Sequence, residues 1–154
     1  MKTKELLQRL DIVTIEIAGI DANAKPDDKK NKDFEKRSLE SELGKRNMKV
    51  NVEVISDEDW FGDEVKVTIG NPSNGKSATI PYKTLDDGES GIFKIPLGGL
   101  LPLGQSLNIG IVDVDGPIDA DDPIGSMTWK APYNFSSSVM KSGAAEYNVN
   151  VDFE

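Results

Sequence analysis

The chain has 154 residues, about the length of one domain, and a formal net charge of −9, because 27 Asp and Glu outweigh 18 Lys and Arg. This negative field repels phosphate backbones, so we expect no nucleic-acid partner. The absence of Cys and His excludes disulfides, thiol nucleophiles, Ser-His-Asp triads and zinc sites with nitrogen or sulfur ligands. Oxygen ligands remain, and they suit hard cations such as Ca²⁺.

Alternating apolar and polar residues predict strands along most of the chain. The clearest alternation occurs at residues 12–17, 49–54, 64–69, 107–112 and 146–153, and weaker alternation at 78–82, 92–97 and 124–129. Turn-forming sequences such as NPSNG and DDGESG separate these segments. Eight short strands predict an all-β antiparallel sandwich or barrel, in a single domain over residues 1–154 with residues 1–10 as an N-terminal extension.

The segment at residues 21–47 breaks this pattern, because it is mostly charged and has few large apolar residues. Leu39 and Leu43 are four residues apart, and Gly44 follows them, which favours a short helix over residues 33–43. The alternative is a solvated surface connection. In either case the segment is expected as an insertion between the first two strands.

The amino terminus, MKTKELLQRLD, carries charge throughout and does not resemble a secretory signal. No stretch approaches the roughly 20 apolar residues of a membrane span. We therefore expect a protein without a transmembrane segment that stays in the cytoplasm, binds a membrane peripherally, or is exported without a Sec-type signal.

Two loops, at residues 56–63 and 113–122, concentrate carboxylates beside predicted strands. Crowded carboxylates repel one another at neutral pH unless a cation neutralises them, and Ca²⁺ accepts six to eight oxygens at about 2.3–2.6 Å. Asp113 and Asp115 are two residues apart at the end of a strand, so both side chains point to the same side and can chelate together. Any single acid here can also be an ordinary solvated turn carboxylate.

Three segments resemble C2 domains, the calcium-dependent phospholipid-binding modules of synaptotagmins and protein kinase C. LNIGIVDVDGPIDADDPIG is similar to the third calcium loop and its flanking strands, SDEDWFGDEVKVTIG to the first calcium loop and the next strand, and KTLDDGESGIFKIPL to the segment between them. The resemblance implies an eight-stranded β-sandwich. It also implies that residues 11–19 form an extra strand before the first loop, in the synaptotagmin-like strand order.

The same resemblance implies a calcium site and a membrane-binding tip. Its expected calcium ligands are Asp57, Asp63, Asp113, Asp115 and Asp122, with Asp121 and Asp59 as further candidates. The side chains expected to meet a membrane or a partner are Trp60, Phe61 and Ile118.

These features predict a calcium-binding adaptor that associates with an anionic membrane or a protein partner when Ca²⁺ is present. The alternative is a structural subunit of a larger complex, with calcium structural or absent, in which the segment at 21–47 and the apolar residues of the amino terminus contact partners. We expect no enzyme activity, because the only candidate acid–base groups are the same clustered carboxylates.

Overall fold

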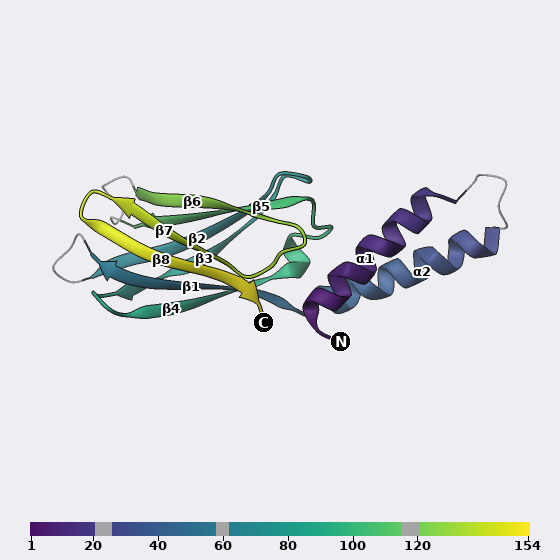
Figure 1. The fold of residues 1–154 in the computed structure, drawn as a ribbon, viewed down its shortest axis with the longest axis horizontal. Coiled ribbons are helices and arrows are strands. Elements are labelled where there is room, and N and C mark those ends of the chain that lie inside the picture. Colours follow the sequence, from purple (N-terminus) through teal and green to yellow (C-terminus); the bar gives the residue numbers. More distant parts are fainter. Residues whose placement is uncertain (21–25, 58–61, 115–120) are drawn as a thin grey trace.

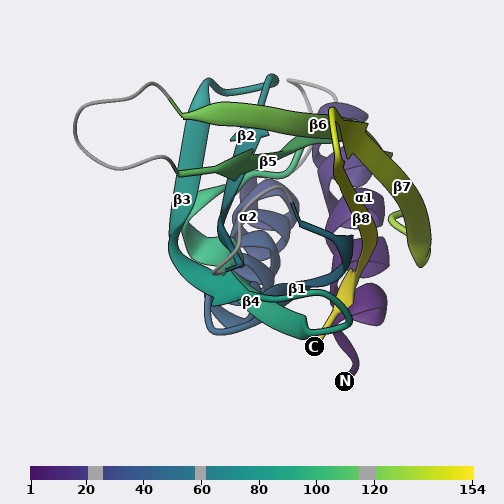
Figure 2. The same cartoon turned by 90° about the vertical axis from the view of Figure 1, so that its left-hand side faces the viewer.

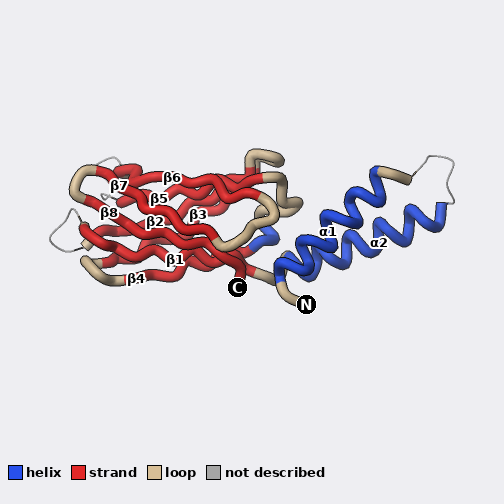
Figure 3. Tube along the Cα trace, in the orientation of Figure 1, coloured by secondary structure: helices blue, strands red, loops and turns tan. Residues whose placement is uncertain are grey.

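The computed structural model describes residues 1–20, 26–57, 62–114 and 121–154, and it divides into a helical hairpin and a β-sandwich (Figure 1). The hairpin consists of α1 (Thr3–Ala18) and α2 (Pro26–Leu43). The strands are β1 (Asn47–Ser56), β2 (Asp63–Asn71), β3 (Lys76–Leu85), β4 (Ser90–Pro96), β5 (Ser106–Asp113), β6 (Asp122–Lys130), β7 (Ser136–Ser142) and β8 (Ala145–Phe153), with a short 3-10 helix, η1 (Leu97–Gly99), after β4. Helices and strands occupy opposite ends of an elongated molecule (Figure 3).

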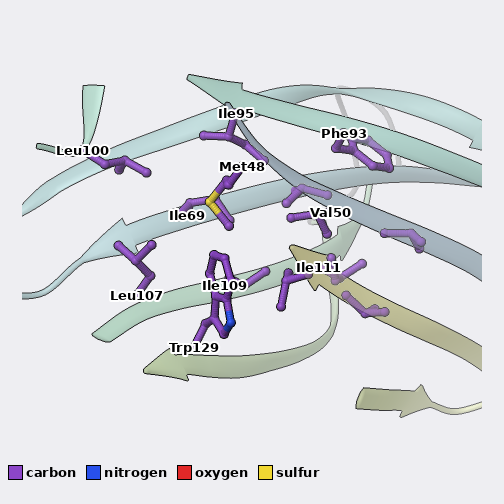
Figure 4. Packing of buried hydrophobic residues seen from close by; sticks show 14 of the residues in the cluster. Met48, Val50, Ile69, Phe93, Ile95, Leu100, Leu107, Ile109, Ile111 and Trp129 are labelled. Carbon is purple, nitrogen blue, oxygen red and sulfur yellow. The ribbon is translucent and has the colours of Figure 1, made fainter. Parts of the chain in front are cut away.

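The eight strands form two four-stranded sheets in the orders β4-β1-β8-β7 and β3-β2-β5-β6. All pairs are antiparallel, and the sheets face each other when the molecule is viewed end-on (Figure 2). Along β2 and β8 every second residue is buried, so the period of two that marks these strands in the sequence fills the space between the sheets. Figure 4 shows this packing around Met48, Ile69, Ile109 and Trp129. The predicted all-β sandwich is confirmed.

The strand predicted at residues 12–17 is wrong, because these residues belong to helix α1. Leu6, Leu10 and Val13 recur at intervals of three and four, and they are buried. Ile15 would share a face with Val13 in a strand, yet it is 71% exposed while Val13 is completely buried. The helical period over the whole segment therefore overrides the short run of alternation.

The synaptotagmin-like strand order depended on that strand and is not found. β1 comes directly before the first acidic loop, and the place beside β1 is taken by β8 from the end of the chain. β7 completes the eight strands. Its sequence, SSSVMKS, has a single buried position and no apolar alternation, so the sequence did not indicate it.

The helix expected over residues 33–43 is confirmed and is longer than predicted, since α2 spans Pro26–Leu43. It lies before the first strand, not between the first two strands. Its charged residues pair with α1: the Arg9 guanidinium lies 2.5 Å from the Glu35 carboxylate, and Lys32 contacts Glu16. The segment is thus one arm of a hairpin and not a solvated connection.

The predicted N-terminal extension at residues 1–10 is also part of this hairpin. Leu6, Leu7 and Leu10 of α1 and Leu43 of α2 belong to the same buried cluster as the sandwich core. Burial of these leucines fixes the base of the hairpin at the end of the sandwich where η1 lies, and the rest of the hairpin projects away (Figure 1).

Candidate metal site at the acidic end

The acidic loops connect β1 to β2 and β5 to β6, and the strand ends on either side of them lie at the end of the sandwich opposite the hairpin (Figure 1). Asp57 follows β1, Asp63 begins β2, and Asp113 ends β5. Asp113 pairs with Val65 on one side and with Asp122 on the other. Antiparallel pairing therefore brings the start of β2, the end of β5 and the start of β6 together at the same end of one sheet.

Asp63 and Asp113 are both buried, with exposed fractions of 0% and 1%. They occupy inward-facing positions of β2 and β5, in line with the core residues Val65 and Ile111. An ionised carboxylate at such a position requires hydrogen bonds or a cation. Here the hydroxyl of Tyr147 on β8 donates to Oδ2 of Asp63, and the backbone N–H of Glu64 donates to Oδ1 of Asp113 at 3.0 Å.

The turn between β3 and β4 adds two carboxylates that the sequence analysis did not place at the site. The backbone N–H of Asp57 donates to Oδ1 of Asp87 at 2.7 Å. Desolvation raises the pKa of Asp57 above its ordinary value, and the contact with Asp87 raises it further. The negative charges of Asp63 and Asp86 act in the same direction. The acidic character of the DDG turn was visible in the sequence, but its position beside Asp57 and Asp63 depends on the pairing of β4 with β1 and of β3 with β2.

Gly62 allows the exit of the first loop to approach this turn. Its φ angle is +86°, in the left-handed region, and an added Cβ would lie 2.6 Å from Oδ1 of Asp86 and 2.8 Å from the carbonyl oxygen of Leu85. Glycine is therefore required here both for the backbone conformation and for the close approach.

Of the remaining predicted site residues, two lie at the surface and the others lie outside the described part of the chain. Asp121 forms an ion pair with Lys66 at 2.9 Å, and Asp122 is exposed. Those outside the described residues are Asp59, Trp60, Phe61, Asp115 and Ile118. Within the described residues, no three acidic side chains are arranged so that they could hold a metal ion by themselves.

No family model matches the sequence, and no curated protein matches it. Among solved structures, the chain is similar to a C2 domain over 71% of its own length and 98% of that chain, at 10% identity and a TM-score of 0.46. It is similar to a C2 domain of plant extended synaptotagmin 1 over 69% and 93%, at 13% identity and a TM-score of 0.41. It is also similar to a structure of CC2D1B over 96% of this chain and 85% of that chain, at 11% identity and a TM-score of 0.35.

All three TM-scores lie below 0.5, so these likenesses assign no family to this chain. The described residues that flank the two acidic loops lie at the same end of the sandwich, as the resembling segments of the sequence imply. Identities of 10–13% transfer neither a ligand nor a residue role to this chain. Among the described helices, none is long and apolar enough to cross a membrane.

Proposed function

We propose that this chain is a non-catalytic binding module that takes up Ca²⁺ at the acidic end of its C2-like sandwich. The supporting observation is the pair of buried carboxylates, Asp63 and Asp113, at the end of the sheet where the acidic loops begin and end. The like charges that raise the pKa of Asp57 add to this, since a cation removes the repulsion among these groups. Calcium fits the chemistry, because only oxygen ligands are present and its geometry is permissive.

The proposed ligands from the described part of the chain are Asp57, Asp63, Asp113 and Asp122. Since no three described acids form a metal site by themselves, we propose that Asp115 completes the coordination shell, with Asp121 and Asp59 as further candidates. In this proposal calcium neutralises the acidic end. The loops then dock on an anionic membrane or a protein partner through Trp60, Phe61 and Ile118.

Thermal melts in chelator and in millimolar calcium test this function. A ligand that binds only the native state adds about 2.7 kcal/mol at a hundredfold excess over its dissociation constant, so calcium should raise the midpoint. Asp113→Asn keeps the acceptor oxygen for the N–H of Glu64 but removes the charge, and it should abolish most of the shift. Asp28→Asn, on the exposed surface of α2, removes the same charge and should leave the shift unchanged. An unchanged wild-type midpoint contradicts the proposal.

A second candidate, a subunit that assembles through its hairpin, is favoured by exposed apolar side chains on both helices. Ile15 on α1 is 71% exposed and Phe34 on α2 is 74% exposed. Light scattering tests self-association: Ile15→Lys should lower an apparent mass above that of the monomer, whereas Gln8→Lys, which adds the same charge at an exposed position of α1, should not. A wild-type chain of monomeric mass contradicts self-assembly through this surface.

A further inference from the structure

The outer face of helix α2 carries an exposed aromatic side chain among basic ones. Phe34 is 74% exposed, and Lys29, Lys30 and Arg37 around it are also exposed. Residues 30, 34 and 37 are spaced by four and three, so their side chains share one face of the helix. A shallow groove of about 420 Å³ is lined by these four residues and by Asp33. We call Lys29, Lys30, Phe34 and Arg37 the basic face of α2.

The basic face differs from the opposite side of α2 in its ion pairs. On that side Lys32 and Glu35 pair with residues of α1. In the part of the chain that the structure describes, no ion pair involves a cation of the basic face. Asp33 brings one carboxylate against three cations, and Asp27 and Asp28 lie in the first turn, where negative charge offsets the helix dipole. The basic face therefore keeps a positive excess that a negatively charged partner can neutralise.

Charge is divided unevenly along the chain. Residues 1–46 contain 11 basic and 10 acidic residues, whereas residues 47–154 contain 7 basic and 17 acidic ones. The net charge of −9 therefore belongs to the sandwich, and the hairpin is close to neutral. Phe34 lies about 13 Å along the helix from Leu43 at the base of the hairpin, at 1.5 Å per residue. This distance exceeds the Debye length of about 8 Å at physiological ionic strength, so the negative field of the sandwich is largely screened at the basic face.

We propose that the basic face of α2 docks on an anionic lipid surface without calcium, with the Phe34 ring in the interface and its three basic neighbours at the lipid phosphates. Lys and Arg side chains suit this position, because their apolar stems lie along the interface while their charged ends reach the headgroups. Fluid headgroups adjust to the cations, whereas a protein partner would need carboxylates placed to match them. The docking surface lies at the end of the molecule opposite the proposed calcium ligands, so it is independent of the calcium function (Figure 1).

Co-sedimentation of the full chain with vesicles in the presence of a chelator tests this docking. We expect the chain to bind phosphatidylcholine vesicles that contain about one-third phosphatidylserine, and to bind pure phosphatidylcholine much more weakly. Phe34→Ala should weaken the binding about tenfold, because no ring then enters the interface. Lys30→Ala and Arg37→Ala should each weaken it about fivefold, and added salt should weaken the binding of the wild type.

Two substitutions elsewhere are matched controls. Phe135→Ala truncates a phenylalanine that is 60% exposed in the loop before β7, and Lys45→Ala removes an exposed cation from the turn after α2. Both variants should bind as the wild type does. Equal losses in the controls, or equal binding to neutral vesicles, overturn the assignment to the basic face. A wild-type chain that binds anionic vesicles only with calcium, or not at all, also overturns it. The calcium function is then unaffected, since the calcium-induced thermal shift measures it separately.

A spin label locates the docked surface without changing the basic face. The chain has no cysteine, so Ser38→Cys, four residues after Phe34, gives a single labelling site on the same side of α2. Ser90→Cys, exposed at the start of β4, gives the comparison at the acidic end. With anionic vesicles in chelator, we expect the label at residue 38 to enter the lipid interface and the label at residue 90 to remain in water. Any other pattern overturns the inference.

Discussion

Tyr133 shows at the residue scale how burial changes a side chain's chemistry. It lies in the loop after β6, where its ring packs edge-on against Trp129, with centroids 5.1 Å apart. Burial raises the pKa of Tyr133 to about 12, and the negative charge of Asp11 on α1 acts in the same direction. The neutral phenol is therefore the form that the folded state favours.

This shift predicts an alkaline loss of stability. The unfolded tyrosine ionises near pH 10 and the folded one near 12, so the unfolded state loses its proton first. The contribution of Tyr133 is complete below about pH 10 and disappears as the pH rises to about 12. Between about pH 9 and 11 the loss amounts to about 1 kcal/mol. Urea denaturation at the two pH values should show a smaller decrease in Tyr133→Phe than in the wild type, and equal decreases contradict the assignment.

Gly62 gives a second prediction at this scale. Alanine at this position pays the penalty of a left-handed backbone, about 1 kcal/mol. Its Cβ would also lie 2.8 Å from the carbonyl oxygen of Leu85. Gly75 is the matched control, because its φ angle is +71° but nothing lies within 4 Å of an added Cβ. Gly62→Ala should therefore lower the free energy of unfolding by at least about 1 kcal/mol more than Gly75→Ala. Equal losses of unfolding free energy in the two variants would show that Gly62 is not in close contact with the β3–β4 turn.

At the scale of elements, the hairpin depends on a few leucines at its base. Leu43, the last residue of α2, is completely buried in the cluster that includes the sandwich core. The ion pairs between α1 and α2 join side chains that are about one-third exposed, and such pairs contribute little. These ion pairs join the two helices only to each other, and the buried leucines attach the hairpin to the sandwich.

Leu43→Ala should lower the free energy of unfolding by about 2–5 kcal/mol, because it leaves a cavity where hairpin and sandwich meet. Ile15→Ala, also a truncation of a large aliphatic side chain in the hairpin, should change it by less than about 0.5 kcal/mol, since Ile15 is 71% exposed. Chemical denaturation of the two variants measures the difference. Similar costs for both would mean that the face of α1 carrying Ile15 is covered in solution.

At the scale of the whole molecule, the strand ends that carry Asp57, Asp63 and Asp113 and the helical hairpin lie at opposite ends (Figure 1). A surface that docks on the acidic end therefore leaves the hairpin free. The two proposed functions therefore use opposite ends of the molecule, and a substitution at one end tests one of them without changing the other end.

The membrane form of the proposed function gives a sharp test. If the loops insert, burial of Trp60 contributes about 2–3 kcal/mol, so Trp60→Ala should weaken calcium-dependent binding to anionic vesicles roughly 30- to 100-fold. Vesicles should also shift the emission of Trp60 to the blue. Trp129 should not respond, because it is buried and its indole N–H donates to the carbonyl of Asn134 at 2.7 Å. Calcium-induced stabilisation without vesicle binding would favour a protein partner.

The sequence by itself determined the sandwich and the composition of its acidic end. Seven of the eight predicted strands coincide with strands of the structure, because alternation records which side chains face a shared core. It failed at residues 12–17, where a short alternating run concealed the helical spacing of Leu6, Leu10 and Val13. It also missed β7, an edge strand with one buried position.

The tertiary structure alone decided which groups meet at the acidic end. Asp87 reaches Asp57 because β4 pairs with β1, and Tyr147 reaches Asp63 because β8 packs across from β2. These pairs are separated by 30 and 84 residues. A local pattern describes only which face of a strand a residue occupies. Partners this far apart are set by strand order and register, which depend on the packing of the whole sandwich.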